Sequence, residues 1–483
     1  MMKMKFSIKA FLVVMVLVIS GCETPFDEVN IDPNNSPTAQ NSQVLSSALG
    51  QLGYMVDANL NSGSFLWAQY YTWGIGVSIG NQERYVSEPR DFDGYWGRAY
   101  SEILIDLKYL RKGQSLAYKG VGDLLTAYVY QGLVDHFGNI PYSEAISGQL
   151  EDGGIQTPKY DDAASVYAEL IKLVDEGLTD LAVAPAEIGA DDYVYQGDLA
   201  KWIKFGNSLK LRLLMRLSEV APKGDAVKAL VAGGNFIENA SDVAAMPFSG
   251  VSGSQNPMYA SFEFGVGDFY FASNATVNVL NDLNDPRLSA FYSPATTGTF
   301  KDQIRGINQG TIDNEPFTAP SSDYSGSSAI AYGPANSVIL MSDWEVWFLR
   351  AEAAARYGTA DNDASAFANA VEHNFSYLGV SGAPAYTASL NYGGSLDNKL
   401  DKIAVQKWIS MNGTQEDEGW IETRRFDRPS SRLFTNGIFQ YPPLSVLANK
   451  AYPSAWLYPS TERSLNPNAP AQRTITDKVF WDN

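Results

Sequence analysis

The feature that most restricts the fold of this chain is the repeated spacing of apolar residues at about 3.6 positions, the period of an amphipathic helix. After Asp161, which we expect to be an N-cap, the stripe consists of Val166, Tyr167, Leu170, Val174, Leu178 and Leu181. After Asp198, in a helix expected to run to about Glu219, it consists of Trp202, Phe205, Leu209, Leu213 and Leu217. Such a stripe is stable only when it packs against another element. The sequence therefore predicts a mainly α-helical fold.

Further helices are expected over residues 43–55, 64–73, 96–110, 122–137, 342–357, 363–378 and 396–411. Ser342 and Glu345 have the spacing of a capping box, in which each side chain bonds the other residue's backbone N–H. Glu352 and Arg356 stand at i,i+4, where opposite charges stabilise a helix. Successive helices of this length predict tetratricopeptide-like helix pairs, although the chain shows no clean 34-residue repeat.

The middle and the end of the chain differ from the helical parts. Residues 221–340 are rich in Gly, Ser, Asn and Pro, and long loops of this kind are usually functional. The short run Ser337–Leu340 is compatible with a strand. We therefore expect a single domain over 41–483, with a helical scaffold at about 41–220 and 341–412, a loop-rich lobe at 221–340 and an irregular C-terminal part at 413–483.

The N-terminus predicts export. Residues 1–21 have the form of a signal peptide: lysines, then an apolar run, then small residues. The apolar run, 10–19, is shorter than the roughly 20 residues that span a bilayer. The segment 17–22 resembles a bacterial lipobox, in which Cys22 becomes the first residue of the mature protein and carries lipid. An ordinary signal with a cysteine nearby by chance is the alternative. Cys22 is the single cysteine, so the chain cannot form an internal disulfide.

The charge of the chain excludes some partners. The formal net charge is −19, which repels nucleic-acid phosphates and anionic lipid surfaces. Attachment to a membrane is therefore expected through the lipid on Cys22. The lipidated tether, 22–40, contains prolines that keep it extended. Its acids behind the cysteine resemble the signal that directs Bacteroidetes lipoproteins to the cell surface; a plain solvated linker is the alternative.

Four sequence blocks, taken in order, point to a known family. They are residues 135–145 (DHFGNIPYSEA), 207–217 (NSLKLRLLMRL), 347–355 (WFLRAEAAA) and 406–409 (QKWI) followed by 420–425 (WIETRR). With Asp285-Pro286-Arg287 and residues 458–462 (YPSTE), this order is similar to the SusD/RagB family of nutrient-binding outer-membrane lipoproteins. The segments 30–37 and 479–482 resemble its SusD-like subgroup. The likeness spans essentially the whole mature chain.

The resemblance implies a fold and a function. The fold would be four tetratricopeptide-like helix pairs with an irregular lobe that carries the ligand site. The protein would be lipid-anchored at the outer surface of the outer membrane, as a lid on a SusC-like TonB-dependent barrel transporter. It would capture oligosaccharides, or peptides, and deliver them without catalysing a reaction, so no catalytic residue is expected. No cofactor or metal site is predicted, since the chain has no EF-hand pattern; a calcium ion held by loop carboxylates is the alternative.

The candidate binding residues are aromatic and polar side chains in the loop-rich parts, because sugars bind to flat ring faces and to polar groups at their edges. They are Trp67, Tyr70, Tyr71, Trp73 and Tyr85 near the N-terminus, Asn256, Tyr259, Asp268, Phe269, Tyr270 and Asn274 in the lobe, and Tyr324 in a Ser/Gly-rich loop. The family fixes no binding residue by motif. For each of these residues, burial as a packing residue is the alternative.

Two other functions remain open from the sequence. A surface glycoside hydrolase needs two carboxylates across the sugar, and the cluster Glu416-Asp417-Glu418 beside Trp420 is the best candidate, with a solvated acidic loop as its alternative. The chain has two histidines, no G-x-S-x-G and no H-E-x-x-H, which disfavours a serine or zinc hydrolase. A protein-binding scaffold or adhesin is the second possibility; it would show no affinity for small ligands.

Overall fold

The structure is a computed structural model that describes residues 39–57, 63–73, 81–261, 270–311, 321–427 and 437–482. The expected signal peptide, the tether up to residue 38, Cys22, Asp268 and Phe269 lie outside the described residues.

The fold is mainly α-helical, as the apolar spacing predicts. The longer helices are α3 (Asn41–Asp57), α6 (Leu104–Lys112), α7 (Leu116–Phe137), α8 (Ala163–Val183), α9 (Leu199–Arg216), α10 (Gly224–Gly233), α12 (Asn274–Asp282), α14 (Asp343–Tyr357), α15 (Asp363–Tyr377), α17 (Leu396–Met411) and α18 (Glu416–Phe426). The shorter ones are α4 (Ser64–Trp67), α5 (Asp93–Gly97), α11 (Pro257–Ser261), α13 (Leu288–Phe291), α16 (Ala383–Ser389) and α19 (Ser460–Leu465). The strands are β1 (Tyr71–Trp73), β2 (Ala244–Met246), β3 (Tyr270–Ala272) and β4 (Val338–Met341).

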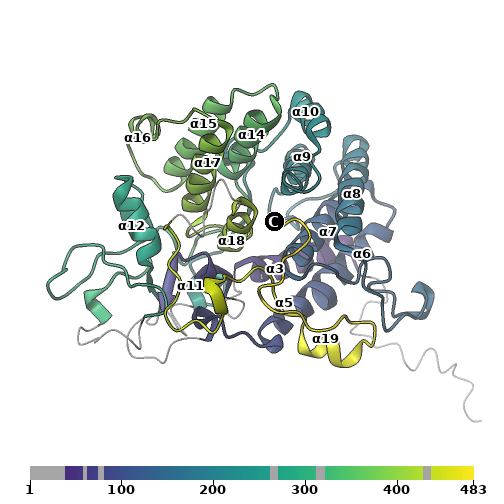
Figure 1. Cartoon of the computed structure of the whole chain (residues 1–483). Helices are drawn as coiled ribbons and strands as arrows, with labels where there is room; N and C mark the ends of the chain where they lie inside the picture. The colour runs from purple at the N-terminus through teal and green to yellow at the C-terminus, as the bar shows by residue number, and fades with distance from the viewer. Residues whose placement is uncertain are drawn as a thin grey trace, which may run out of the picture.

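The helices pack as neighbours in two groups. Helices α6 to α9 stand beside one another, and α14, α15 and α17 form a second group, with α18 against α17 (Figure 1). Helices α7 and α8 approach closely at two glycines: a Cβ on Gly177 would lie 3.0 Å from the carbonyl oxygen of Gly120. Larger side chains at these two positions would force the pair apart.

The N-caps follow the sequence with one exception. Asp198 caps α9 as expected, accepting the N–H of Ala200 at 3.0 Å. Helix α8 is capped by Asp162, which accepts the N–H of Ser165, and not by Asp161. The carboxylate of Asp161 instead accepts the N–H of Ser143 at 2.7 Å, because its backbone bridges to the loop after α7.

Two of the expected segments are different in the structure. The helix expected over 64–73 ends at Trp67, since Gln69 has a positive φ of 58°, and Tyr71–Trp73 is strand β1. The C-terminal part is not irregular throughout, because it contains α18 and α19. The apolar pattern does not predict helix α18, because the helix is rich in charged residues. Most of those side chains are buried and paired rather than solvated.

The loop-rich lobe contributes to two small antiparallel sheets, and the sheet of β1 and β3 joins it to the N-terminal part of the chain. Strand β1 pairs with β3, so that Trp73 lies opposite Tyr270, and β2 pairs with β4. The strand expected at Ser337–Leu340 is therefore confirmed as β4, shifted by one residue. In Figure 1, α12 of the lobe lies at the end of the molecule away from α6 and α8, whereas α10, which falls within 221–340, packs beside α9 and α14 of the scaffold.

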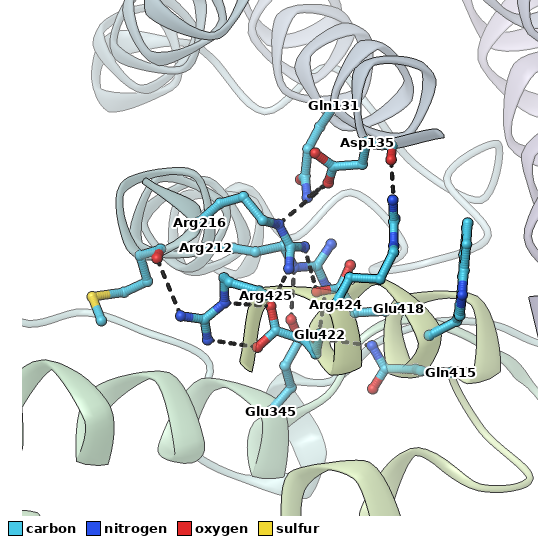
Figure 2. A network of polar contacts seen from close by, with 12 residues as sticks. Gln131, Asp135, Arg212, Arg216, Glu345, Gln415, Glu418, Glu422, Arg424 and Arg425 are labelled. Carbon is cyan, nitrogen blue, oxygen red and sulfur yellow. Dashed lines mark hydrogen bonds and ion pairs between the residues drawn. The ribbon is translucent and has the colours of Figure 1, made fainter. Parts of the chain in front are cut away.

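A buried ionic network joins α7, α9, α14 and α18 (Figure 2), and Lys407 connects α17 to it. Its pairs are Arg212–Glu345, Arg216 with Asp135, Glu418 and Glu422, Lys407–Glu422, and Arg425 with Glu352 and Glu422. Burial by itself would raise the pKa of Glu422, but Arg425, Lys407 and Arg216 hold it well below its usual range. Most of these residues come from the four family blocks, so the network brings together blocks that are far apart in the sequence.

The same network changes the expected capping box. Ser342 caps α14 by accepting the N–H of Glu345 at 3.1 Å. The Glu345 carboxylate does not return to Ser342; it accepts two 2.6 Å hydrogen bonds from Arg212. The i,i+4 pair of Glu352 and Arg356 forms as expected, at 2.7 Å.

Candidate functional site

A polar cleft of about 380 Å³ lies in the lobe, between α12 and the segment 300–311. Its lining consists of Asn274, Val277, Asn278, Asn281, Phe300, Gln303, Ile304, Arg305, Gly306, Ile307, Asn308, Thr311 and Tyr324. The volume is within the range of about 300 to 1,000 Å³ that small-molecule sites occupy. This cleft is the candidate ligand site.

The wall of the cleft is set by close packing of residues 306–307 against the start of α12. Ser273 caps α12, and the N–H of Asn274 donates to the carbonyl of Ile307 at 2.8 Å. A Cβ on Gly306 would lie 2.6 Å from Asn274 Oδ1 and 2.9 Å from the carbonyl oxygen of Ala272. Glycine is therefore needed at position 306 for this approach.

One side of the cleft carries a stack of planar groups. The Arg305 guanidinium lies 4.2 Å from the ring centroid of Phe300 and 4.1 Å from that of Tyr324. Tyr324 also packs edge-on against Phe271 of β3, with ring centroids 6.1 Å apart. Cation–π contacts of this kind hold the rings in place. The cleft thus has a fixed aromatic wall, and Phe300 keeps 37% of its surface exposed.

The other side of the cleft is a row of amides. Asn274, Asn278 and Asn281 follow one another at helical spacing on α12, and Asn274 Nδ2 donates to Asn308 Oδ1 at 2.7 Å. An amide offers both donors and an acceptor, which suits a hydroxyl that both donates and accepts. Among the lining residues that the structure describes, Arg305 is the one that carries a charge. The arrangement is suited to an uncharged, hydroxyl-rich ligand with a flat face.

The structure brings two of the sequence candidates, Asn274 and Tyr324, into this cleft. Two others, Trp73 and Tyr270, face each other across β1 and β3 with ring centroids 4.7 Å apart, and Trp73 is half-buried. Asn256 is buried and its Oδ1 accepts the N–H of Tyr259, which is half-buried.

The remaining described candidates are core residues. Trp67, Tyr70, Tyr71 and Tyr85 are at most 3% exposed, so they present no ring face to solvent. Trp67 Nε1 donates to the carbonyl of Gln82, and Tyr70 stacks on Trp408 at 5.6 Å. Burial raises the pKa of the Tyr70 hydroxyl, which donates to the Trp408 carbonyl. Tyr71 packs edge-on against Tyr292 of the lobe, and the Tyr292 hydroxyl donates to the Tyr70 carbonyl, so this pair connects the lobe to the helical scaffold.

Sequence reasoning missed Asn278, Asn281, Phe300, Gln303, Arg305 and Asn308. The three asparagines at positions 274, 278 and 281 gave a usable signal, since i, i+4 and i+7 lie on one face of a helix. Phe300 and Arg305 gave none, because only the folding of their segment onto α12 places them beside Tyr324.

The acidic cluster 416–418 begins α18, with Glu416 and Glu418 buried and Asp417 half-buried. Glu418 pairs with Arg216 at 2.5 Å, and Asp417 accepts from His136 Nε2 at 2.9 Å. Burial raises the pKa of Glu418 in spite of Arg216. The neighbouring cavity, at about 50 Å³, has room for ordered water but not for a sugar ring. The sequence allowed two interpretations of this cluster, a catalytic carboxylate pair and a solvated acidic loop, and the structure agrees with neither.

Two searches of the described residues give negative results. No group of three or more His, Cys, Asp or Glu side chains there is placed to hold a metal ion. None of the helices in the described segments has the length and apolarity that crossing a membrane requires.

Comparison with known proteins identifies a matching family. A family model named SusD-like, described as starch-binding and associating with the outer membrane, matches residues 33–459. A search of curated proteins finds no match.

Solved structures share the fold. A chitin-binding SusD homolog from Flavobacterium johnsoniae has 20% sequence identity and a TM-score of 0.76, covering 92% of this chain and 98% of its own. A SusD-like protein from Bacteroides thetaiotaomicron has 21% identity and a TM-score of 0.76, covering 92% and 99%. A SusD homolog from Bacteroides uniformis has 21% identity and a TM-score of 0.72, covering 91% and 99%. The helical scaffold with its irregular lobe, together with the family match over most of the sequence, shows that the chain belongs to the SusD-like family of proteins that associate with the outer membrane.

Proposed function

We propose that the protein captures neutral oligosaccharides at the cell surface, in the cleft between α12 and residues 300–311, and delivers them intact to a SusC-like TonB-dependent barrel transporter. The observation that carries the proposal is the cleft itself, in which the Tyr324–Arg305–Phe300 stack faces a row of α12 amides. A sugar ring needs an apolar face and hydrogen-bonding edges, and both are present here.

Two further observations support capture rather than cleavage. The acidic cluster that a glycoside hydrolase would use is bound to Arg216 and His136 in the core. The family description refers to starch, and a solved relative is named chitin-binding. Anchoring through lipid on Cys22 and exposure at the outer surface belong to the proposal, because residue 22 lies outside the described residues.

The test is calorimetric titration of the full chain in lauryldimethylamine oxide, a detergent that carries no sugar. The probes are maltohexaose, chitohexaose and a neutral hexapeptide. We expect a hexasaccharide to bind at micromolar to millimolar Kd, and Tyr324→Ala or Asn278→Ala to weaken it by about tenfold. Tyr193→Ala is the matched control, since Tyr193 is 40% exposed and lies outside the cleft.

The outcomes separate the alternatives. Equal affinity of Tyr324→Ala and Tyr193→Ala for the hexasaccharide would refute the cleft as the site. Binding of the hexapeptide alone would replace the oligosaccharide by a peptide ligand. Binding of no probe, combined with capture of another protein, would favour the scaffold function. Delivery is tested by co-purification with a barrel transporter expressed from the same organism.

A further inference from the structure

A second, larger groove of about 760 Å³ lies on a different part of the molecule. It is formed by the start of α14, the end of α15, the β2–β4 sheet and residues 330–337; its lining is Asn239, Ala240, Val243, Ala245, Ile330, Asn336, Ser337, Ile339, Asp343, Trp344, His373, Ser376 and Tyr377. None of these residues lines the α12 cleft. The groove is therefore a separate space, and nothing in the proposed function uses it.

An aromatic pair forms one wall of this groove. The rings of Trp344 and Tyr377 have centroids 4.8 Å apart and are tilted by 46°. Tyr377 keeps 41% of its surface exposed, which leaves part of its ring available for stacking. Trp344 is 1% exposed, and its indole N–H is buried without a hydrogen-bond partner. An unpaired buried donor is unfavourable, so a ligand oxygen that reaches it is favoured.

The charges in the groove cancel. The acidic and basic side chains of its described lining, Asp343 and His373, form a pair with 2.7 Å between Oδ2 and Nδ1. The hydrogen bond to Asp343 raises the pKa of His373 and so favours the charged imidazolium beside the carboxylate. The Asp343 carboxylate also accepts a 2.9 Å hydrogen bond from the backbone N–H of Trp344, which fixes the position of the carboxylate. Because Asp343 and His373 are each other's partners, the described lining of the groove presents no unpaired charge to a ligand.

The rest of the lining is mixed. Asn239, Asn336, Ser337 and Ser376 add hydrogen-bonding groups, and Val243 and Ile339 add apolar surface. A large neutral groove with a stacking ring, amides, hydroxyls and an unpaired N–H has the chemistry that a carbohydrate recognises.

We propose that this groove is a second binding site for a neutral oligosaccharide, with a sugar ring stacked on Tyr377 and a sugar oxygen accepting the indole N–H of Trp344. Occupation of both sites lets one chain hold two oligosaccharides, or two parts of a long one. The proposal does not depend on the α12 cleft being a site, and its test separates the two.

The experiment uses the full chain in lauryldimethylamine oxide, titrated with maltohexaose and chitohexaose. The Tyr324→Ala variant, in which the α12 cleft is impaired, should still bind one equivalent of a hexasaccharide. In that background Tyr377→Ala should weaken the remaining binding by about tenfold, and Ser376→Trp, which fills the groove, should abolish it. Tyr193→Ala, in the same background, should leave it unchanged.

A spectroscopic measurement locates the ligand directly. The indole N–H resonance of Trp344, assigned in ¹⁵N-tryptophan-labelled protein by its loss in Trp344→Phe, should shift when the hexasaccharide is added. Failure of the Tyr324→Ala variant to bind either sugar would overturn the second site, as would unchanged binding in both Tyr377→Ala and Ser376→Trp. A third result would support the groove and refute the cleft. In it, the wild type binds one equivalent of hexasaccharide, Tyr324→Ala still binds it, and Ser376→Trp does not. Circular dichroism confirms that each variant is folded.

Discussion

A guanidinium nitrogen of Arg425 on α18 lies 2.6 Å from the carboxylate of Glu352 on α14, and both side chains are 1% exposed. A second contact, 2.7 Å long, joins the same Arg425 nitrogen to Glu422. One cation thus pairs with two buried carboxylates from different family blocks. This relationship ties α18, which the apolar pattern does not reveal, to the helical scaffold.

Removal of Arg425 should therefore be strongly destabilising. Arg425→Met leaves Glu352 and Glu422 buried with one cation fewer, and breaking such a pair costs about 3 to 5 kcal/mol in the free energy of unfolding. Urea denaturation followed by circular dichroism measures this loss. The matched control is Arg90→Met, whose pair with Glu88 is solvent-exposed and should change stability by less than about 1 kcal/mol. A loss below about 1 kcal/mol for Arg425→Met would contradict the role given to the network.

Glu83, on the 3₁₀ turn η2 (Asn81–Arg84), should give the protein an unusual dependence of stability on pH. Burial raises its pKa from 4.5 to about 7, in spite of hydrogen bonds from Thr72 and the backbone of Gly310 and Trp73. A carboxyl with a raised pKa in the folded state stabilises the protein below the unfolded pKa, and that contribution is lost as the pH rises through about 7.

Glu83→Gln removes this titration. Between pH 5 and pH 8 the wild type should lose about 2 to 3 kcal/mol more stability than the variant does. Denaturant titrations at the two pH values measure the difference, which is insensitive to the other carboxyls because they are common to both proteins. If the free energy of unfolding changed equally in the two proteins between pH 5 and pH 8, the Glu83 carboxyl would not have a raised pKa and would be charged in the folded protein at neutral pH.

Gly306→Ala should impair the cleft without touching its ligand groups. The added methyl would lie 2.6 Å from Asn274 Oδ1 and 2.9 Å from the Ala272 carbonyl, so residues 306–307 must move away from α12. We expect a loss of about 1 to 3 kcal/mol in stability and weaker hexasaccharide binding. Gly326→Ala is the control, since a Cβ there meets no atom within 4 Å. If Gly306→Ala binds as tightly as Gly326→Ala, the close approach does not shape the site.

Arg305 should act as a planar packing group and not as a counter-charge. Arg305→Lys keeps the charge but loses the flat guanidinium that contacts Phe300 and Tyr324, so hexasaccharide affinity should fall several-fold. Because the proposed ligand is neutral, raising NaCl from 50 to 500 mM should change the wild-type Kd by less than about twofold. A steep salt dependence, with Arg305→Lys behaving as wild type, would indicate an anionic ligand.

Part of this fold follows from local sequence signals. Asp198 caps α9 as its position predicts, and α17 has the expected bounds of Leu396 and Met411. Local signals do not predict an element whose buried side chains pair with residues far away in the sequence. Helix α18 has charged residues in place of an apolar stripe, and Glu422 is stable there only because Arg216, Lys407 and Arg425 surround it.

The sequence predicts less of the cleft than of the fold. Polar and aromatic residues in a loop-rich lobe include Asn274 and Tyr324, but the same criterion also selects Tyr70 and Tyr71, which are completely buried. Composition does not separate an exposed ring from a core ring. Phe300 and Arg305 join the site through the folding of one loop onto α12, which no local pattern indicates.

The most direct measurement of the central claim is a crystal structure of the protein soaked with the hexasaccharide that binds most tightly in calorimetry. The account predicts an intact sugar in the α12 cleft, with one ring stacked against Tyr324 and hydroxyls within hydrogen-bonding distance of the Asn278 amide. A cleaved sugar, or a cleft left empty while the sugar occupies another place, would contradict it.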